Sequence, residues 1–399
     1  AIGLELHAWR LASQILSTVA QADADRIGGW EGFQRALLQR PQEVLAGLTP
    51  PAPGYHAVLA ALQDYESRSM TGLALVDSGW ERLGPLDVAS GVASLRARLA
   101  REGYNVTATG DPLRWGEGLS AGLRAYQRRF SLAETGRADA ETLRSLGVSF
   151  EERASQIRAV LRHMKNAPYY RVPTRIVVNI PAFTLQHFEG GRLVATHRVV
   201  VGAIGRDKSG KVKRGGRINT TPFLAGAITA IVLNPSWHVP QRIKEELDVL
   251  AARDPSIYDT FRLYVDADGR ERAVQPPSPY SALGKVKLAF PNSQAIFLHD
   301  TPRTELFKER VRAFSHGCIR VENAVGLAKS LLDRDRGTLG SSKADALLRS
   351  NFETPVTLTT SVPVFIEYVT AGIGSGGAFR FFPDIYDTGP VSPARPEQP

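Results

Sequence analysis

The stretch Phe314-Ser315-His316-Gly317-Cys318-Ile319-Arg320-Val321-Glu322-Asn323 is the part of this sequence on which the interpretation of the whole chain depends. It contains the only cysteine among 399 residues, directly after a glycine and two positions before an arginine. The thiolate is the reactive form of cysteine, and an ordinary thiol, with a pKa near ~8.5, is mostly protonated at neutral pH. A reactive Cys318 therefore needs a base, a cation or backbone N–H groups nearby, and this stretch offers candidates for each.

A free cysteine is most often a small buried hydrophobic residue. The neighbours of Cys318 argue against that role, because Ser-His-Gly-Cys-x-Arg has no apolar periodicity. Gly317 permits a tight turn in which its own N–H and that of Cys318 point at one oxyanion. The apolar spacing from Val321 to Leu332 predicts a helix, so we expect Cys318 to lie just ahead of a helix N-terminus, which favours negative charge on sulfur.

A histidine suited to act as the base lies upstream of the cysteine. Residues 295–299 predict a short buried strand that ends at His299, and Pro302 prevents its continuation. A histidine at a strand end, followed by a loop that returns to a cysteine, is the arrangement that a Cys–His pair requires. His316, two positions before the cysteine, is the competing candidate for the base.

The composition is that of an ordinary folded protein, with 43% hydrophobic and 22% charged residues. No run of eighteen apolar residues occurs, so no membrane span is predicted. A single cysteine excludes an internal disulfide. The net charge of +9 indicates either acidic surroundings, such as nucleic acid, an anionic envelope polymer or a membrane surface, or simply a basic, solvated surface. Nucleic acid is disfavoured as a partner, because the basic residues are spread along the chain and match no reader motif.

The order of helical and strand patterns divides the chain into five segments. We predict a helical scaffold for residues 1–85 and three short amphipathic helices for residues 86–150. Residues 151–174 predict a further helix and a linker, residues 175–378 predict mainly strands, and residues 379–399 form a Pro-rich tail. The three short helices are expected at 92–101, 119–130 and 139–146.

Strands are expected at 175–180, 184–188, 193–201, 228–233, 285–290, 295–299, 356–359 and 364–369. Residues 241–283 are interpreted as an insertion, in which a charged helix at 242–250 is followed by irregular, Pro-rich chain. The basic loop 202–216 lacks the sequence order of a phosphate-binding loop. The tail from Pro383 onward contains five prolines and is not expected to build a core.

His299, fifteen intervening residues (300–314) and then Ser-His-Gly-Cys-x-Arg together resemble the signature of the L,D-transpeptidases with a YkuD-type catalytic domain. Three further segments resemble the YcbB-type branch of that family, namely 178–183, 234–240 and 298–302. Residues 86–150 resemble the peptidoglycan-binding-like domain often found beside this catalytic domain. The sequence departs from the family in its longer basic loop 202–216, in Phe297 where a tyrosine is common, and in its Pro-rich tail.

The resemblance implies an α+β fold, in which a mostly-β catalytic domain at 175–378 carries a capping insertion at about 238–283. It implies that Cys318 is the nucleophile and that His299 is the base, oriented by the backbone carbonyl of Asp300. His316 is then expected to shape the site and to support the oxyanion, with the N–H groups of Gly317 and Cys318 as donors. The residues expected to contact substrate are Arg320, Trp237, Phe297, Asn234, Ser315 and Asp300.

Two of these residues have a second interpretation. Arg320 stays protonated, so it either holds a substrate carboxylate and lowers the thiol pKa, or forms structural hydrogen bonds within the loop. Trp237 either forms a wall of the substrate groove or packs beside the adjacent prolines.

The implied reaction is acyl transfer between peptidoglycan stem peptides through a thioester on Cys318, with a meso-diaminopimelate amine of a second stem as acceptor. The product is a 3–3 link, or a 1–3 link as a variant, and no metal or organic cofactor is required. A cysteine peptidase or amidase would use the same residues with water as acceptor. A non-catalytic wall-binding protein would instead depend on glycan contact by residues 86–150. We expect an exported, periplasmic monomer, with its signal peptide absent from this chain, no nucleic-acid partner and no membrane span.

Overall fold

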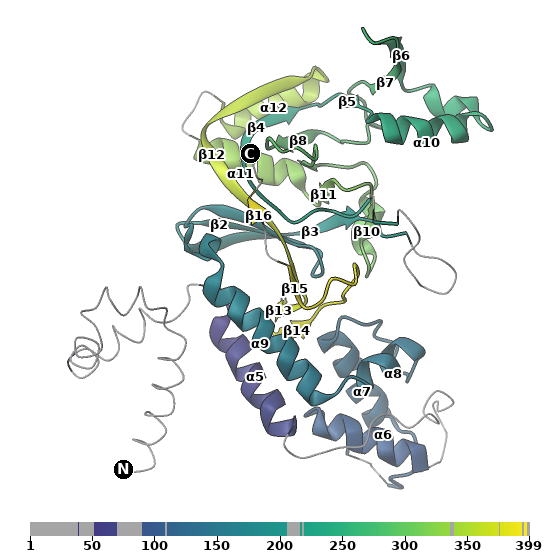
Figure 1. The fold of residues 1–399 in the computed structure, drawn as a ribbon, viewed down its shortest axis with the longest axis vertical. Coiled ribbons are helices and arrows are strands. Elements are labelled where there is room, and N and C mark those ends of the chain that lie inside the picture. The colour runs from purple at the N-terminus through teal and green to yellow at the C-terminus, as the bar shows by residue number, and fades with distance from the viewer. Residues whose placement is uncertain are drawn as a thin grey trace.

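A computed structural model gives the fold of the chain. It describes residue 39 and residues 52–69, 90–107, 110–205, 216–217, 219–335, 339–374, 376–392 and 395–396. A helical domain lies at one end of the molecule, a barrel-like sheet in the middle, and a small cap at the other end (Figure 1). The predicted α+β fold, with a mostly-β domain beside a helical one, is confirmed.

The helical domain consists of α5 (Tyr55–Ser69), α6 (Ser90–Arg101), α7 (Glu117–Arg129), α8 (Ala140–Leu146) and α9 (Phe150–Asn166). Side-chain caps begin two of these helices: Asp139 accepts from the Thr142 N–H, and Ser149 forms a capping box with Glu152. The apolar faces meet in one core that includes Tyr65, Leu99, Leu123, Tyr126 and Leu143. The 3-10 helix η2 (Pro168–Arg171) follows and leads into the sheet.

The three short helices expected between residues 86 and 150 are present as α6, α7 and α8, with the expected leucines buried. Of the scaffold predicted for residues 1–85, only α5 and Gln39 lie within the described residues.

The barrel is built from β1 (Arg175–Asn179), β2 (Thr184–Glu189), β3 (Arg192–Gly202), β4 (Leu224–Leu233), β8 (Val286–Ala289), β9 (Leu298–His299), β11 (Ile319–Val321) and β12 (Thr354–Val369). These strands pair in the order β12-β1-β2-β3-β11-β9-β8-β4, and β4 pairs again with β12, so the sheet closes on itself. The short strand β10 (Ala313–Ser315) pairs with β3 alongside this ring. Inward-facing Ile, Leu and Val residues form the core, which α11 (Ala324–Arg334) and α12 (Ser341–Ser350) complete.

The two strands expected at 356–359 and 364–369 are one continuous strand, β12. Its pairing with β4 shifts register between Thr357 and Val362, which is where the sequence pattern is interrupted. A shift of this kind absorbs an irregular stretch while the backbone stays extended. As a result, β12 pairs with β1 on one side and with β4 on the other, and thereby closes the barrel.

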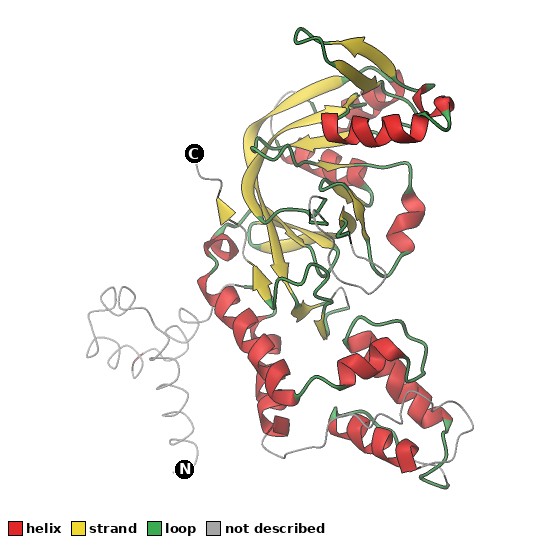
Figure 2. Cartoon of the chain, turned by 45° about the vertical axis from the view of Figure 1, so that its right-hand side comes forward, coloured by secondary structure: helices red, strands yellow, loops and turns green. Residues whose placement is uncertain are grey.

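The cap contains β5 (Trp237–His238), α10 (Gln241–Ala251), η3 (Pro255–Tyr258), β6 (Arg262–Val265) and β7 (Glu271–Gln275). Its strands form a separate sheet in the order β5-β7-β6, which stands beside α10 (Figure 2). The charged helix of the insertion is therefore confirmed, whereas the irregular chain expected after it is wrong. Every residue of β6 is exposed, so this strand carries no alternation of apolar and polar residues that would reveal it.

The C-terminal segment joins both cores. The hairpin of β13 (Ala371–Ile373) and β14 (Phe379–Phe381) places Phe381 in the helical core, stacked on Phe130 at 4.8 Å between ring centroids. Tyr386, only 1% exposed, belongs to the barrel core and donates to the Gly202 carbonyl at 2.6 Å. The expectation that the tail from Pro383 builds no core is therefore wrong up to β15 (Val391–Ser392), which pairs with β12. The two-residue strand β16 (Arg395–Pro396) pairs with β4 in parallel.

Candidate active site

Three polar side chains stand in a row across neighbouring barrel strands, and we call Lys287, His299 and Arg320 the polar row. Backbone pairing aligns Lys287 of β8 with His299 of β9, and His299 with Arg320 of β11. Residues in register project from the same face of a sheet. Their chain neighbours are buried in the barrel core, namely Leu288, Leu298 and Ile319. The polar row therefore lies on the outer face of the barrel.

Cys318 directly precedes β11 and lies at this same face. Ile319 is in register with Leu298, and its N–H donates to the Phe297 carbonyl at 3.1 Å. The structure thus brings the predicted nucleophile and the predicted base onto adjacent strands. The sulfur is half-buried and lies 3.8 Å from the Ala295 carbonyl oxygen, a distance suited to a weak S–H hydrogen bond.

His299 is 5% exposed and held in one orientation. Its Nδ1 lies 2.5 Å from the Asp300 carbonyl oxygen, which is the contact that the resemblance implies. A carbonyl only accepts, so Nδ1 carries the proton and Nε2 carries the lone pair. Burial, followed by the positive charges of Arg320 and Lys287, lowers the pKa of His299 to about 3. The imidazole is therefore neutral at pH 7, as a general base must be.

The thiol of Cys318 is protonated in this state. Burial raises the pKa of Cys318 above its ordinary value, while the Phe297 backbone N–H, Lys287 and Arg320 oppose that rise. The expected helix N-terminus is not among these influences. Strand β11 intervenes, and α11 begins only after its N-cap, Asn323. The dipole of α11 falls off within its first turn, so the expectation that it favours the thiolate is wrong.

The turn before the cysteine depends on Gly317, whose φ of +120° is unfavourable for any residue with a side chain. Its N–H donates to Ser315 Oγ at 3.2 Å, and Ser315 Oγ in turn donates to the Cys318 carbonyl at 2.5 Å. The Gly317 N–H is therefore engaged within the loop, which corrects its expected role as an oxyanion donor. The Cys318 N–H has no acceptor among the described residues and remains available.

The two cations of the polar row differ in their contacts. The Nε and Nη1 atoms of Arg320 are buried yet have no hydrogen-bond partner among the described residues. Lys287 Nζ lies 4.2 Å from the ring centroid of Phe297, which itself packs edge-on against the His299 ring at 5.6 Å. Buried donors without acceptors carry a desolvation cost, which an anionic ligand would relieve.

His316 points to the cap and not to the polar row. Its Nε2 lies 3.0 Å from Glu246 Oε2 on α10, and both side chains are partly exposed. This contact joins the cysteine loop to the capping insertion. It gives His316 a role in the relative position of these two parts, and its effect on the reaction stays a prediction.

Three residues expected to contact substrate have structural roles instead. Asn234 is 1% exposed and its amide donates to the carbonyls of Leu347 at 2.9 Å and Phe352 at 3.3 Å, so it fixes the end of α12. The Asp300 carboxylate accepts from the Lys285 N–H at 2.8 Å. Ser315 is 3% exposed and closes the cysteine loop as described above. A polar residue near a motif can equally satisfy buried backbone groups, and the contact of these three residues with substrate stays a prediction.

Besides Arg320, two further expected substrate contacts are partly accessible. Phe297 is half-buried beside His299, and Trp237 is half-buried in β5 of the cap, 6.1 Å from the Phe261 ring. Trp237 therefore has both a packing partner and an accessible face.

Sequence reasoning missed Lys287 and Glu246. The alternation in Val286-Lys287-Leu288 shows that the lysine faces away from the core, and this could have been predicted from the sequence. Its alignment with His299, however, depends on the pairing of β8 with β9. Glu246 lies 70 residues from His316 and no local pattern links the two.

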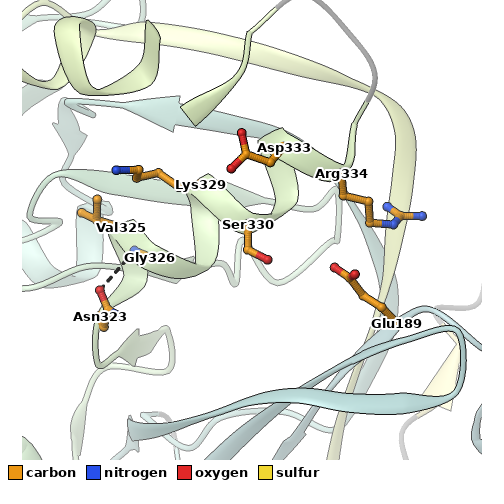
Figure 3. Close-up of a pocket in the computed structure, with 8 residues that line it drawn as sticks. All are labelled: Glu189, Asn323, Val325, Gly326, Lys329, Ser330, Asp333 and Arg334. Atoms are coloured by element: carbon orange, nitrogen blue, oxygen red, sulfur yellow. Dashed lines mark hydrogen bonds between the residues drawn. The ribbon is translucent and has the colours of Figure 1, made fainter. Parts of the chain in front are cut away.

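A surface hollow of about 680 Å³ lies along α11 (Figure 3), and neither Cys318 nor His299 lines it. Two of its charged groups already have partners: Lys329 binds Asp345 at 2.8 Å, and Asp333 accepts from the Ser341 N–H at 2.7 Å. Asn323 caps the helix at Gly326, so its side chain is also engaged. Among the described residues no cluster of three metal-ligating side chains occurs, and no helix is long and apolar enough to cross a membrane.

Two family models match this chain. Residues 173–346 match the L,D-transpeptidase catalytic domain, YkuD, and residues 89–146 match a putative peptidoglycan binding domain. A putative L,D-transpeptidase of Haemophilus influenzae is 35% identical over 230 residues, which are 53% of this chain and 44% of that protein. This chain thus corresponds to less than half the length of that relative.

The chain also has matches of low overall similarity among solved structures. An L,D-transpeptidase from Xylanimonas cellulosilytica is 14% identical, with 74% of this chain and 98% of that chain covered and a TM-score of 0.22. An L,D-transpeptidase from Mycobacterium smegmatis is 12% identical, with 49% and 58% covered and a TM-score of 0.24.

Proposed function

We propose that the chain crosslinks peptidoglycan stem peptides, because residues 173–346 match the L,D-transpeptidase catalytic domain and residues 89–146 match a putative peptidoglycan binding domain. The observation that carries the proposal is the placement of Cys318 and a neutral, oriented His299 on adjacent strands. Because peptidoglycan lies outside the cytoplasm, the site of action is extracytoplasmic, and we assign it to the periplasm.

In the first half of the reaction, His299 Nε2 takes the proton of the Cys318 thiol as sulfur attacks a peptide carbonyl of the donor stem. The carbonyl oxygen becomes an oxyanion that accepts from the Cys318 N–H. When the C–N bond breaks, the leaving amine takes the proton from His299, and a thioester remains on Cys318. The raised pKa of Cys318 and the lowered pKa of His299 mean that this proton moves only as the carbonyl is attacked.

In the second half, the side-chain amine of a meso-diaminopimelate on another stem attacks the thioester carbonyl. His299 accepts the proton that this amine loses and returns a proton to the departing sulfur. The new amide is the crosslink, of the 3–3 type or of the 1–3 type as a variant, and the free thiol is restored. Arg320, with its unpartnered guanidinium nitrogens, and Lys287 supply positive charge for the carboxylates of the stems.

The test is mass spectrometry of muropeptides after purified sacculi are incubated with the full chain, with Cys318→Ala as control. We expect crosslinked dimers that contain two diaminopimelate residues and that are absent with the control variant. Shortened, uncrosslinked stems would instead identify a cysteine peptidase or amidase with water as acceptor. Unchanged sacculi that nevertheless bind both proteins would identify a non-catalytic wall-binding protein.

The same nucleophile is expected to react with a carbapenem. The strained β-lactam carbonyl presents an electrophile of the same kind as the scissile amide, so Cys318 opens the ring and keeps the acyl group. Intact mass should show one adduct per chain and none on Cys318→Ala. An adduct that persists in the alanine variant would contradict the assignment of the nucleophile.

A further inference from the structure

A second pocket lies between the helical domain and the barrel. Its volume is about 560 Å³, within the range of sites that hold small molecules. We call it the interdomain pocket; its polar lining consists of Arg128, Ser131, Glu134, Thr184, Gln186, Thr196, Arg198, Arg310, Arg312, Glu322 and Arg380. The helical domain, strands β2 and β3, the chain before the cysteine loop, and β14 all contribute.

Five arginines but only two glutamates line this pocket, and the arginines differ in their partners. Arg128 is paired with Glu134 at 2.5 Å, Arg198 forms a two-pronged pair with Glu322, and Arg310 is paired with Glu141 at 2.9 Å. The other two, Arg312 and Arg380, make no ion pair with any described residue. The pocket therefore retains positive charge that no protein carboxylate neutralises.

Arg312 is held firmly although it has no acidic partner. Its guanidinium donates to the backbone carbonyls of Val199, Glu309 and Phe183, at 3.2, 2.8 and 3.1 Å. Burial, followed by the neighbouring charge of Arg198, lowers the pKa of Arg312 to about 10, so it stays positive at neutral pH. Glu322 acts on Arg312 through its charge but forms its ion pair with Arg198, so Arg312 is a buried, oriented cation without a direct carboxylate partner among the described residues, which suits it to receive an anion from outside the protein.

The two domains are tied together at the pocket. Arg310 of the barrel donates to the Ser131 carbonyl at 3.0 Å, and Ser131 Oγ donates to the Phe381 carbonyl at 2.8 Å. The walls from the helical domain and the barrel are therefore set in position before any ligand binds, which reduces the entropic cost of binding.

The interdomain pocket opens on the same outer face as the polar row. Arg320 is in register with Val200 of β3, and Arg198 lies two residues before Val200 on that strand. Between them, the 3-10 helix η4 (Thr304–Lys308) covers Val200 with Leu306 and Phe307. A ligand that extends across η4 can therefore reach both sites from one side of the molecule.

We propose that the interdomain pocket binds the carboxylates of a second peptidoglycan stem, separate from the stem that acylates Cys318. This proposal rests on the proposed function, because it takes peptidoglycan as the substrate. Arginine guanidinium groups recognise carboxylates through paired N–H donors, and the side chains of Thr184, Gln186 and Thr196 offer hydrogen bonds to peptide groups. The ligand class is thus an acidic, amide-rich stem peptide of the acceptor strand.

The test measures binding of a purified disaccharide tetrapeptide, with free and with chemically amidated carboxylates, to the full chain carrying Cys318→Ala. Adding Arg380→Glu should weaken binding of the free-acid probe at least fivefold, because it replaces a positive charge of the pocket with a negative one. Arg380 is chosen because it makes no ion pair with a described residue, so its replacement should not disturb the fold. The matched control is Arg349→Glu, the same charge change on exposed α12, and it should leave binding unchanged. The amidated probe should bind the parent as weakly as the free acid binds Arg380→Glu.

A separate acylation experiment distinguishes failure of this proposal from failure of the proposed function. With Cys318 intact, Arg380→Glu should be acylated by a carbapenem at the rate of the parent chain. If the carbapenem does not acylate the parent chain, that result contradicts the proposed function. The second site is then judged from the binding measurements alone. Equal binding by the parent, Arg380→Glu and Arg312→Gln would overturn the second site. So would a loss of acylation parallel to the loss of binding, since Arg380 would then act on the donor stem.

Discussion

The polar row and the interdomain pocket both gather cations on one face of the barrel, but they treat charge differently. In the polar row, Arg320 and Lys287 have no carboxylate partner among the described residues, and their positive charges help to lower the pKa of His299 and oppose the rise that burial causes in the pKa of Cys318. In the interdomain pocket, three of five arginines are paired with glutamates. Unpaired charge beside a reactive group adjusts its protonation, whereas paired charge mainly fixes geometry. We therefore expect substitutions in the polar row to change catalysis and the titration of the thiol, and substitutions of paired arginines in the interdomain pocket to change mainly stability.

The largest effect is expected from His299→Ala, which removes the base of the polar row. Activity on sacculi should fall by about 10²–10⁴-fold, the usual contribution of general acid–base catalysis. Because the pKa of His299 is about 3, it stays neutral from pH 8 down to pH 5, so its protonation should cause no loss of kcat/KM over that range. His316→Ala should have a smaller effect and leave the titration of the thiol unchanged. If His316→Ala alone shifts that titration, the two roles must be exchanged.

A second, intermediate effect is expected from Lys287→Met, which removes charge but keeps the stem of the side chain. Lys287 lowers the pKa of both Cys318 and His299, so both should rise in the variant. Alkylation of Cys318 by iodoacetamide should then shift to higher pH and become a few-fold slower at pH 7, since only the thiolate reacts. Lys343→Met, on exposed α12, is the control. An unchanged alkylation profile would show that the polar row does not adjust the thiol.

A smaller effect is expected from Glu246→Gln, which weakens the contact between the cap and His316. Both partners are well exposed, so the contact contributes only about 0.2–1 kcal/mol. Crosslinking of sacculi should change by at most about fivefold, and carbapenem acylation should not change. Glu245→Gln, the exposed neighbour on α10 without an ion pair, provides the comparison. The same change in both variants would exclude a specific role for the His316 contact.

The smallest effect is expected from Arg310→Gln in the interdomain pocket. Its pair with Glu141 is exposed, so thermal unfolding should report a loss of at most about 1 kcal/mol. The alkylation profile of Cys318 should match that of the parent chain, in contrast to Lys287→Met. A shifted thiol titration would remove the distinction between the two regions.

Local sequence patterns were sufficient for several elements and for part of the site. The leucine and aromatic spacing predicted α6, α7 and α8, because each helix buries one stripe of its own residues. The Cys–His pair was predictable because a cysteine in a polar, glycine-containing loop and a histidine at a strand end are both local features. Patterns failed for β6, where no residue is buried, and for Tyr386, whose Pro-rich surroundings concealed its place in the barrel core.

The sequence by itself determined which groups are available for chemistry: one thiol, two histidines that are candidates to accept its proton, and a glycine at the turn before the cysteine. Only the tertiary structure decided which N–H groups remain free, which cations act on the thiol, and which arginines are left without a carboxylate. Cys318 precedes a strand and not a helix, Ser315 engages the Gly317 N–H, and Lys287 aligns with His299 through β8 and β9. Hydrogen-bond partners and electric fields depend on distance in space, and strand pairing joins residues that the sequence keeps apart.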